Sequence, residues 1–267
     1  MTAALLVATT VCCLAYLAAA RRLRARGDRW PLGRDLAFCA GGTVLVTGWA
    51  APWHGWPPFT GHMVSHLAAG MAAPLLLVLG RPVTLALRVL LVAPRRRLLS
   101  CVRSRAAAVP LWPPVAAAVH IGGLWAVYRT PLFAAAHHRP WLHALVYVHF
   151  LLSGALFTLA VLAVEPLRHR STHALRGGAL LAAAAAHGIL AKSLYVTGPP
   201  GLPGTEITET DLHTASRVMY YGGDLTGIAL AALLALQWYA AGGRALARAA
   251  QVRAAPRRRR GEADTVR

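Results

Sequence analysis

Seven apolar stretches, each roughly 20 residues long, constrain the fold of this chain more than any other feature. They cover residues 3–20, 35–51, 62–80, 110–127, 141–164, 174–197 and 216–241. A helix of about 20 residues spans the hydrocarbon core of a bilayer, and only helices or closed barrels satisfy their backbone hydrogen bonds there. The sequence therefore predicts an all-α fold, a polytopic membrane helix bundle with about seven transmembrane helices.

Composition agrees with a membrane protein. Hydrophobic residues make up 57% of the chain, charged residues make up 14%, and the mean hydropathy is +0.49, a balance that soluble domains rarely show. A further apolar stretch, Val83 to Ala93, is followed by Pro94 and has only about half the length that a span needs. We expect it to form a helix that lies at the membrane surface.

The basic residues lie on one side of the predicted spans. If the N-terminus faces outward, the cytoplasmic segments are 21–34, 81–109, 165–176 and 242–267, and they carry 24 of the 28 lysines and arginines. Only Arg129, Arg139, Lys192 and Arg217 then lie outside. Because cytoplasmic loops of membrane proteins are enriched in Lys and Arg, this split predicts an outside N-terminus and an inside C-terminus.

The chain has a formal net charge of +19, and most of its basic residues lie in these predicted cytoplasmic segments. On a soluble chain this charge would indicate binding to nucleic acid, but here it lies along one membrane face, and no nucleic-acid partner is expected. Basic clusters beside a bilayer attract anionic lipid headgroups by about 1 kcal/mol per residue. We expect a single transmembrane helical domain, residues 1–241, and a disordered basic cytoplasmic tail, residues 242–267.

His62 and His66 stand four residues apart at the start of the third span. On a helix this spacing places both imidazoles on one face. Ionisable side chains inside a membrane span are costly and usually face a cavity, a partner or a ligand. The pair therefore indicates a binding site, although a lone intramembrane histidine more often just hydrogen-bonds to a neighbouring helix.

Ten of the twelve histidines fall in the outer loops or in the outer to middle part of the spans. Imidazole binds copper, zinc and iron, and a thioether favours cuprous copper. Histidines on opposing helices can equally be the axial ligands of a haem. The candidate metal ligands are His62, His66, His143, His149 and His187, with Met63 as a soft ligand. Their spacing alone leaves copper and haem open.

The last span contains a carboxylate, Asp224, which needs a partner or a proton at this depth. Lys192 lies at a comparable depth on the preceding span, so a buried ion pair is one interpretation. In the other, Asp224 orients His187 through its second ring nitrogen, as carboxylates near metal sites commonly do.

The sequence shows no catalytic arrangement. It has neither a Gly-rich phosphate loop nor the H-E-x-x-H spacing of zinc proteases, so we do not expect an enzyme. The loop from Gly198 to Ser216 carries Glu206, Glu209 and Asp211 after a turn rich in Pro and Gly. We expect these three carboxylates to form a solvated acidic face.

The third span also carries a family resemblance. The run Gly61-His62-Met63-Val64-Ser65-His66 and the later run Ala73-Pro74-Leu75-Leu76, with Gly80 and Pro82, resemble the signature of the CtaG-type family of cytochrome c oxidase assembly proteins. Trp141 to Phe157, His187 to Ile189 and Gly223 to Gly227 are also similar to that family. The chain departs from the family pattern at Ser65, where a glutamine is expected, and in the spacing of His143 and His149.

This resemblance implies a bacterial multi-pass protein of the cell membrane that assists the assembly of a haem-copper cytochrome c oxidase. It would handle or deliver copper through an outward-facing histidine site, with an oxidase subunit or a copper chaperone as its partner. His62 and His66 match the family best, followed by His143 or His149, His187 and Asp224.

The alternative function is a haem-binding membrane protein or electron carrier with His66, His149 and His187 as axial ligands. A copper transporter is less well supported, because no ionisable residue continues inward along the third to seventh spans.

Overall fold

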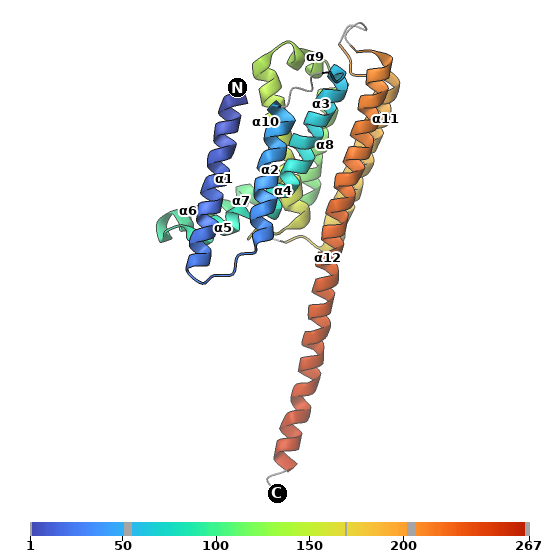
Figure 1. Cartoon of the computed structure of the whole chain (residues 1–267). Coiled ribbons are helices and arrows are strands. Elements are labelled where there is room, and N and C mark those ends of the chain that lie inside the picture. The colour runs from blue at the N-terminus through green and yellow to red at the C-terminus, as the bar shows by residue number, and fades with distance from the viewer. Residues whose placement is uncertain (1, 51–54, 169, 202–206, 265–267) are drawn as a thin grey trace.

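The computed structural model describes residues 2–50, 55–168, 170–201 and 207–264, and all regular secondary structure in these residues is helical (Figure 1). The elements are α1 (Thr2–Ala25), α2 (Leu32–Ala50), α3 (Pro58–Leu67), the π-helical turn η1 (Ala68–Ala72), α4 (Ala73–Leu79), α5 (Pro82–Val89), α6 (Val92–Val102), α7 (Arg105–Ala108), α8 (Pro113–Arg129), α9 (Leu132–His137), α10 (Pro140–Leu162), α11 (His173–Thr197) and α12 (Glu209–Asp264).

Each predicted span corresponds to helix in the structure, so the all-α fold is confirmed for the described residues. Five helical segments there are long and apolar enough to cross a membrane: Ala3–Ala25, Pro58–Val89, Pro140–Leu162, His173–Thr197 and Glu209–Arg248. The other two predicted spans, α2 and α8, are helices of 19 and 17 residues outside this group. The number of seven spans and their orientation stay predictions.

The apolar stretch Val83 to Ala93 does not form one helix, contrary to expectation. α5 ends at Val89, the backbone of Leu90 and Leu91 is extended with ψ of 147° and 163°, and α6 starts at Val92. Pro94 therefore lies in the first turn of α6 and does not close the segment. Proline is tolerated there because the first turn of a helix does not use its N–H groups. A location at the membrane surface stays a prediction for both helices.

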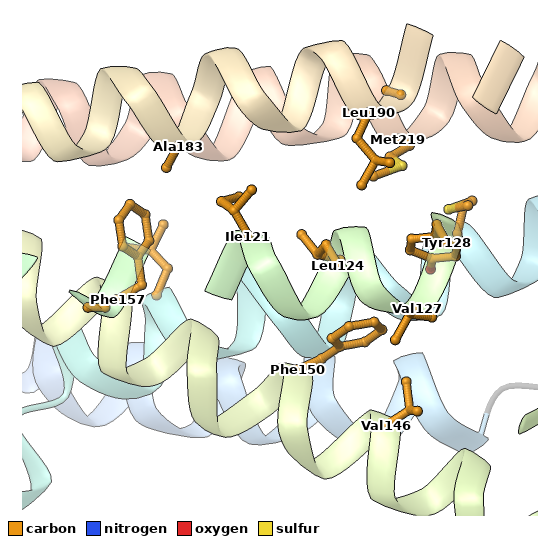
Figure 2. Packing of buried hydrophobic residues seen from close by; sticks show 14 of the residues in the cluster. Ile121, Leu124, Val127, Tyr128, Val146, Phe150, Phe157, Ala183, Leu190 and Met219 are labelled. Carbon is orange, nitrogen blue, oxygen red and sulfur yellow. The ribbon is translucent and has the colours of Figure 1, made fainter. Parts of the chain in front are cut away.

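The main core lies between α8 and its neighbours. Figure 2 shows Ile121, Leu124 and Tyr128 of α8 with Phe150 of α10 on one side and Leu190 of α11 on the other. Helices in a bilayer associate through close packing and not through the exclusion of water, because lipid tails are as apolar as leucine. α8 therefore joins α10 to the pair α11 and α12, which also pack directly against each other.

α1 packs at the edge of the bundle against α2 and α5. The Tyr16 hydroxyl donates a hydrogen bond of 2.6 Å to the Gly80 carbonyl, and its ring stacks on Phe38 with a centroid distance of 4.1 Å. At the C-terminal end of α1, buried Asp35 accepts a hydrogen bond from Trp30 Nε1 and pairs with Arg24. These contacts tie the first helix to the rest of the chain.

A buried carboxylate of α12 caps the start of α3. Asp211 accepts hydrogen bonds from the backbone N–H of Phe59 (2.9 Å) and of Thr60 (2.8 Å), and from the Thr60 hydroxyl (2.7 Å). The first N–H groups of a helix have no partner within it, so an anion there stabilises it. Asp211 is only 2% exposed, so its expected place on a solvated acidic face is wrong.

Glu165 makes a matching cap at the start of α5. Its carboxylate accepts hydrogen bonds from the backbone N–H of Val83 (3.0 Å) and of Thr84 (2.8 Å), and also from the Thr84 hydroxyl. Both capped helices begin with proline at the first position, Pro58 in α3 and Pro82 in α5. The sequence Pro-x-Thr followed by a distant carboxylate therefore occurs at both helix starts.

The two ends of the chain lie at opposite ends of the molecule (Figure 1). α1 begins at the end of the bundle where α3 starts, and α12 leaves the opposite end and continues as one helix to Asp264. Residues 242–264 thus extend α12 beyond the bundle. The domain boundary at residue 241 and the disorder of the tail stay predictions.

Candidate functional site

A cavity of about 560 Å³ lies where α3, α9 and α10 meet, and we call it the histidine cavity. Three imidazoles line it, from His62 of α3, His137 of α9 and His143 of α10. The rest of its lining is mostly apolar and aromatic, and no lysine, arginine or carboxylate is present among the described lining residues. The cavity therefore presents imidazole nitrogens, which are metal ligands in many proteins, in mostly apolar surroundings.

His62 is fixed by contacts on several sides. Its Nε2 is hydrogen-bonded to the hydroxyl of buried Tyr128 at 2.9 Å, and its ring lies edge-on to Phe133 with centroids 4.8 Å apart. The His143 ring centroid is 6.2 Å away across the cavity. His62 and His143 therefore form the first histidine pair, which we call the outer pair.

His66 lies one helical turn further along α3 and is only 1% exposed. Neither of its ring nitrogens has a hydrogen-bond partner. Its ring packs edge-on against Phe150, with ring centroids 4.6 Å apart. It also faces His187 of α11, with ring centroids 6.4 Å apart and an interplanar angle of 22°. His187 is 3% exposed, and its Nε2 is also unpaired. We call these two residues the inner pair.

α12 approaches the inner pair closely at Gly223. A Cβ atom at this position would lie 2.2 Å from Cε1 and 2.4 Å from Nδ1 of His187. Only glycine fits against the imidazole without a shift of the helix or of the ring. Gly223 therefore makes space for His187, whereas its neighbour Gly222 makes space for Leu67, whose Cδ1 would lie 2.4 Å from an added Cβ.

The π-helical turn η1 follows His66 almost directly. Within it the Ala73 N–H bonds to the Ala68 carbonyl, five residues back. Pro74 has no N–H to donate to the Gly70 carbonyl, which faces α10 so closely that a Cβ at Gly154 would lie 1.9 Å from it. Such turns are frequent at functional sites because they re-aim the side chains on either side.

The remaining candidate ligands lie elsewhere. His149 faces α8, where a Cβ at Gly123 would lie 2.0 Å from its Nε2, and this nitrogen is buried and unpaired. Its six-residue spacing from His143 predicts that the two point to different sides of α10, and the structure places them so. Met63 is fully buried in the main core.

Asp224 and Lys192 make neither of the two expected contacts. Among the described residues the ion pairs are Arg24–Asp35 and Arg88–Asp28, and no hydrogen bond joins Asp224 to His187. Asp224 lines an apolar groove of about 750 Å³ between α11 and α12. Lys192 instead places its Nζ over the ring of Tyr220, 5.3 Å from the centroid.

Three residues that shape the site, His137, Tyr128 and Asp211, are not predicted from the sequence. His137 was visible only as a loop histidine, and the loop forms the short helix α9 over the cavity. Tyr128 gave no signal, because a tyrosine near a helix end is common. Asp211 stands three residues after Thr208 at a helix start, a pattern that resembles an ordinary cap.

No three His, Cys, Asp or Glu residues of the described part of the chain are grouped closely enough to hold a metal ion together. The structure instead contains two histidine pairs, the outer pair and the inner pair. Two imidazoles that share an ion in a linear arrangement have ring centres roughly 6 Å apart, because each metal–nitrogen bond is about 2.0 Å long, and a bent arrangement brings them closer. The centroid separations of 6.2 Å in the outer pair and 6.4 Å in the inner pair lie at the upper limit of this length.

Comparison with known proteins gives one family and several relatives. The chain matches the model of the cytochrome c oxidase caa3 assembly factor family (Caa3_CtaG) over residues 14–241. It is 30% identical over 243 residues to an uncharacterized protein of Mycobacterium leprae, covering 84% of this chain and 37% of the relative. Uncharacterized proteins of Mycobacterium bovis and Mycobacterium tuberculosis are each 31% identical over 249 residues, covering 86% of this chain and 38% of the relative.

This chain thus spans little more than a third of the length of these relatives. No solved structure matches it.

Proposed function

We propose a function from one premise, namely that this chain belongs to the cytochrome c oxidase caa3 assembly factor family. In this proposal the protein assists the maturation of a haem-copper oxidase at the cell membrane. It receives copper in the histidine cavity, holds it at the inner pair and passes it to an oxidase subunit or a copper chaperone. Copper is the cargo, and no covalent bond of a substrate is broken.

The observation that carries this proposal is the unpaired imidazole of His66. A buried polar group without a partner costs about 1–3 kcal/mol, and most buried polar atoms in proteins are paired. Both nitrogens of His66 and Nε2 of His187 are buried without a protein partner, and the two rings are 6.4 Å apart. An ion shared by the two rings would satisfy one nitrogen of each.

The outer pair supports a route to this position. His62 and His66 are one helical turn apart, which is about 5.4 Å along the axis. The outer pair lines the cavity, and the inner pair is buried behind it. Copper in the cavity would bind His62 and His143 and then exchange ligands stepwise towards His66 and His187. Cuprous copper suits such sites because it accepts two ligands in a line.

No contact favours the haem alternative. A macrocycle between His66 and His187 needs room around the iron, but the His66 ring is in contact with Phe150, and α12 approaches His187 at Gly223. His149, the third proposed axial ligand, faces Gly123 of α8. These close contacts leave less room for a macrocycle than for a single ion, which supports the copper proposal over the haem alternative.

Copper content measured together with an optical spectrum tests the proposal. The purified 267-residue chain is loaded with cuprous ion, washed and compared with His66→Leu and His187→Leu. His138→Ala is the matched control, because His138 is exposed and does not line the cavity. We expect about one retained copper per chain in the wild type and in the control, and its loss in both inner-pair variants.

Retention of copper by both inner-pair variants would overturn the site. A Soret band in the purified protein would move the assignment to haem. A separate assay measures the copper content and activity of the oxidase in cells that carry only His66→Leu. If this variant fails to bind copper and the oxidase is still loaded fully, copper handling is not the protein's contribution to assembly.

A further inference from the structure

A further pocket, of about 290 Å³, lies between α11 and α12 and shares no residue with the histidine cavity or with the apolar groove at Asp224. We call it the cationic pocket. Its polar lining residues are Lys192, Tyr195, Ser216, Arg217, Tyr220 and Tyr221. It lies near the end of α11 and the start of α12, the end of the bundle that the arginine distribution predicts to face outward.

The lining carries two positive charges and no carboxylate. Aromatic rings support both cations: Lys192 Nζ lies 5.3 Å from the ring centroid of Tyr220, and Arg217 Cζ lies 5.7 Å from that of Tyr195. Arg217 also donates a hydrogen bond of 3.4 Å to the Tyr195 hydroxyl. Neither cation belongs to the ion pairs of the described residues. Lys192 and Arg217 therefore give the pocket a formal charge of +2, which an anion can neutralise.

Ser216 supplies an independent sign of a ligand. It is 2% exposed, and its Oγ is buried without a hydrogen-bond partner. A serine hydroxyl in a helix commonly bonds to a carbonyl of the preceding turn, as those of Ser193 and Thr214 do. The Ser216 hydroxyl makes no such bond and lines the pocket, where an acceptor atom of a ligand would satisfy it.

The depth of the pocket indicates which anion it takes. Lys192, the only lysine of the chain, is exposed five residues before the end of a helix that is apolar enough to span a membrane. Its Cα is therefore roughly 8 Å below that end. At this depth a lysine reaches up to the headgroup level, where tyrosines also gather. The anion available there is the phosphate of a phospholipid.

We propose that the cationic pocket binds the phosphate of an anionic phospholipid in the leaflet at this end of the bundle. Lys192 and Arg217 neutralise the phosphate, Ser216 donates a hydrogen bond to it, and the Tyr220 and Tyr221 rings contact the glycerol and the first methylenes of the lipid. This specific site is distinct from the general attraction of lipids to the arginine clusters at the opposite end.

The test is the thermal unfolding midpoint of the 267-residue chain in a neutral detergent, with added phosphatidylglycerol, phosphatidylcholine or inorganic phosphate. We expect phosphatidylglycerol to raise the midpoint by about 5 °C, as a ligand well above its Kd does, and the other two to leave it unchanged. The increase should vanish in Lys192→Gln/Arg217→Gln. It should persist in Arg21→Gln/Arg22→Gln, which removes two exposed charges at the opposite end.

Ser216→Ala separates lipid binding from a structural role. Removing an unpaired buried hydroxyl should leave the midpoint without lipid unchanged or higher, while the response to phosphatidylglycerol decreases. The proposal is overturned if the lipid response survives in the Lys192/Arg217 variant, or if it falls equally in the Arg21/Arg22 control. An equal response to inorganic phosphate would make the ligand a free anion and overturn the lipid assignment.

Discussion

Asp211 and His66 are both buried polar residues, and their surroundings differ at the scale of single atoms. The Asp211 carboxylate receives three hydrogen bonds from the start of α3, so its burial is fully compensated. His66 receives none. Buried polar groups that are satisfied hold a fold together, and unsatisfied ones need an explanation such as an ion. We infer a structural role for Asp211 and a binding role for His66 from this difference.

The sequence could predict part of this site. The four-residue spacing places His62 and His66 on one face of α3. The position of both side chains within a predicted span indicates a role beyond packing. The sequence could not show that His62 meets His143 while His66 meets His187, because those partners are set by how α10 and α11 pack against α3. These partners are 81 and 121 positions apart in the sequence, and contacts over such separations leave no local pattern.

Gly223→Ala is a prediction at the residue scale. The added methyl group would lie 2.2 Å from the His187 ring, so the ring or α12 must move. Overpacking of this kind costs about 1–3 kcal/mol, and a displaced His187 no longer faces His66. We expect a lower thermal midpoint and weaker copper retention in the same loading assay.

Gly227→Ala is the matched control for this change, one turn later on α12. A Cβ at Gly227 meets nothing within 4 Å, so alanine there should stabilise the helix by up to about 1 kcal/mol. If both variants retain copper equally well, the close approach at Gly223 has no part in positioning the inner pair.

At the scale of elements, the third span shows where local patterns stop being informative. Its apolar run predicts one continuous helix, and the structure contains α3, the π-helical turn η1 and α4. Pro74 alone is compatible with a kink, a break or a wide turn. The close contact of the Gly70 carbonyl with α10 accompanies the wide turn here, and that contact depends on a helix about 80 residues later in the sequence.

The cap on α3 leads to a prediction for an element. Asp211→Ala leaves the N–H groups of Phe59 and Thr60 and the Thr60 hydroxyl without an acceptor. Loss of a buried charged acceptor costs about 2–3 kcal/mol, so we expect a thermal midpoint several degrees lower. His62 lies two residues after Thr60, so copper retention should fall as the first turn of α3 loosens.

Glu209→Ala provides the comparison for this variant. Glu209 is exposed in the same first turn of α12, and its loss should change the free energy of unfolding by no more than about 0.5 kcal/mol. An Asp211→Ala protein as stable as Glu209→Ala would show that α3 does not depend on the cap.

At the scale of the whole molecule, the two candidate sites and the cap that positions α3 gather at one end. The histidine cavity, the Asp211 cap and the cationic pocket all lie where α3 and α12 begin. The other end holds the Glu165 cap on α5, the buried Arg176 and helix α6 with its three consecutive arginines. The distribution of basic residues predicts which of these ends faces the cytoplasm, and this orientation stays a prediction until the topology in a membrane is measured.

Reporter fusions test that topology as the last prediction. If 24 of the 28 lysines and arginines lie in cytoplasmic segments, the positive-inside rule places the histidine cavity outside. Alkaline phosphatase, which folds only outside the cytoplasm, should be active when fused after Arg139 and inactive when fused after Arg103. Green fluorescent protein after Arg267 should fluoresce. The reverse pattern would place the cavity in the cytoplasm, so that copper would have to reach the inner pair from inside the cell.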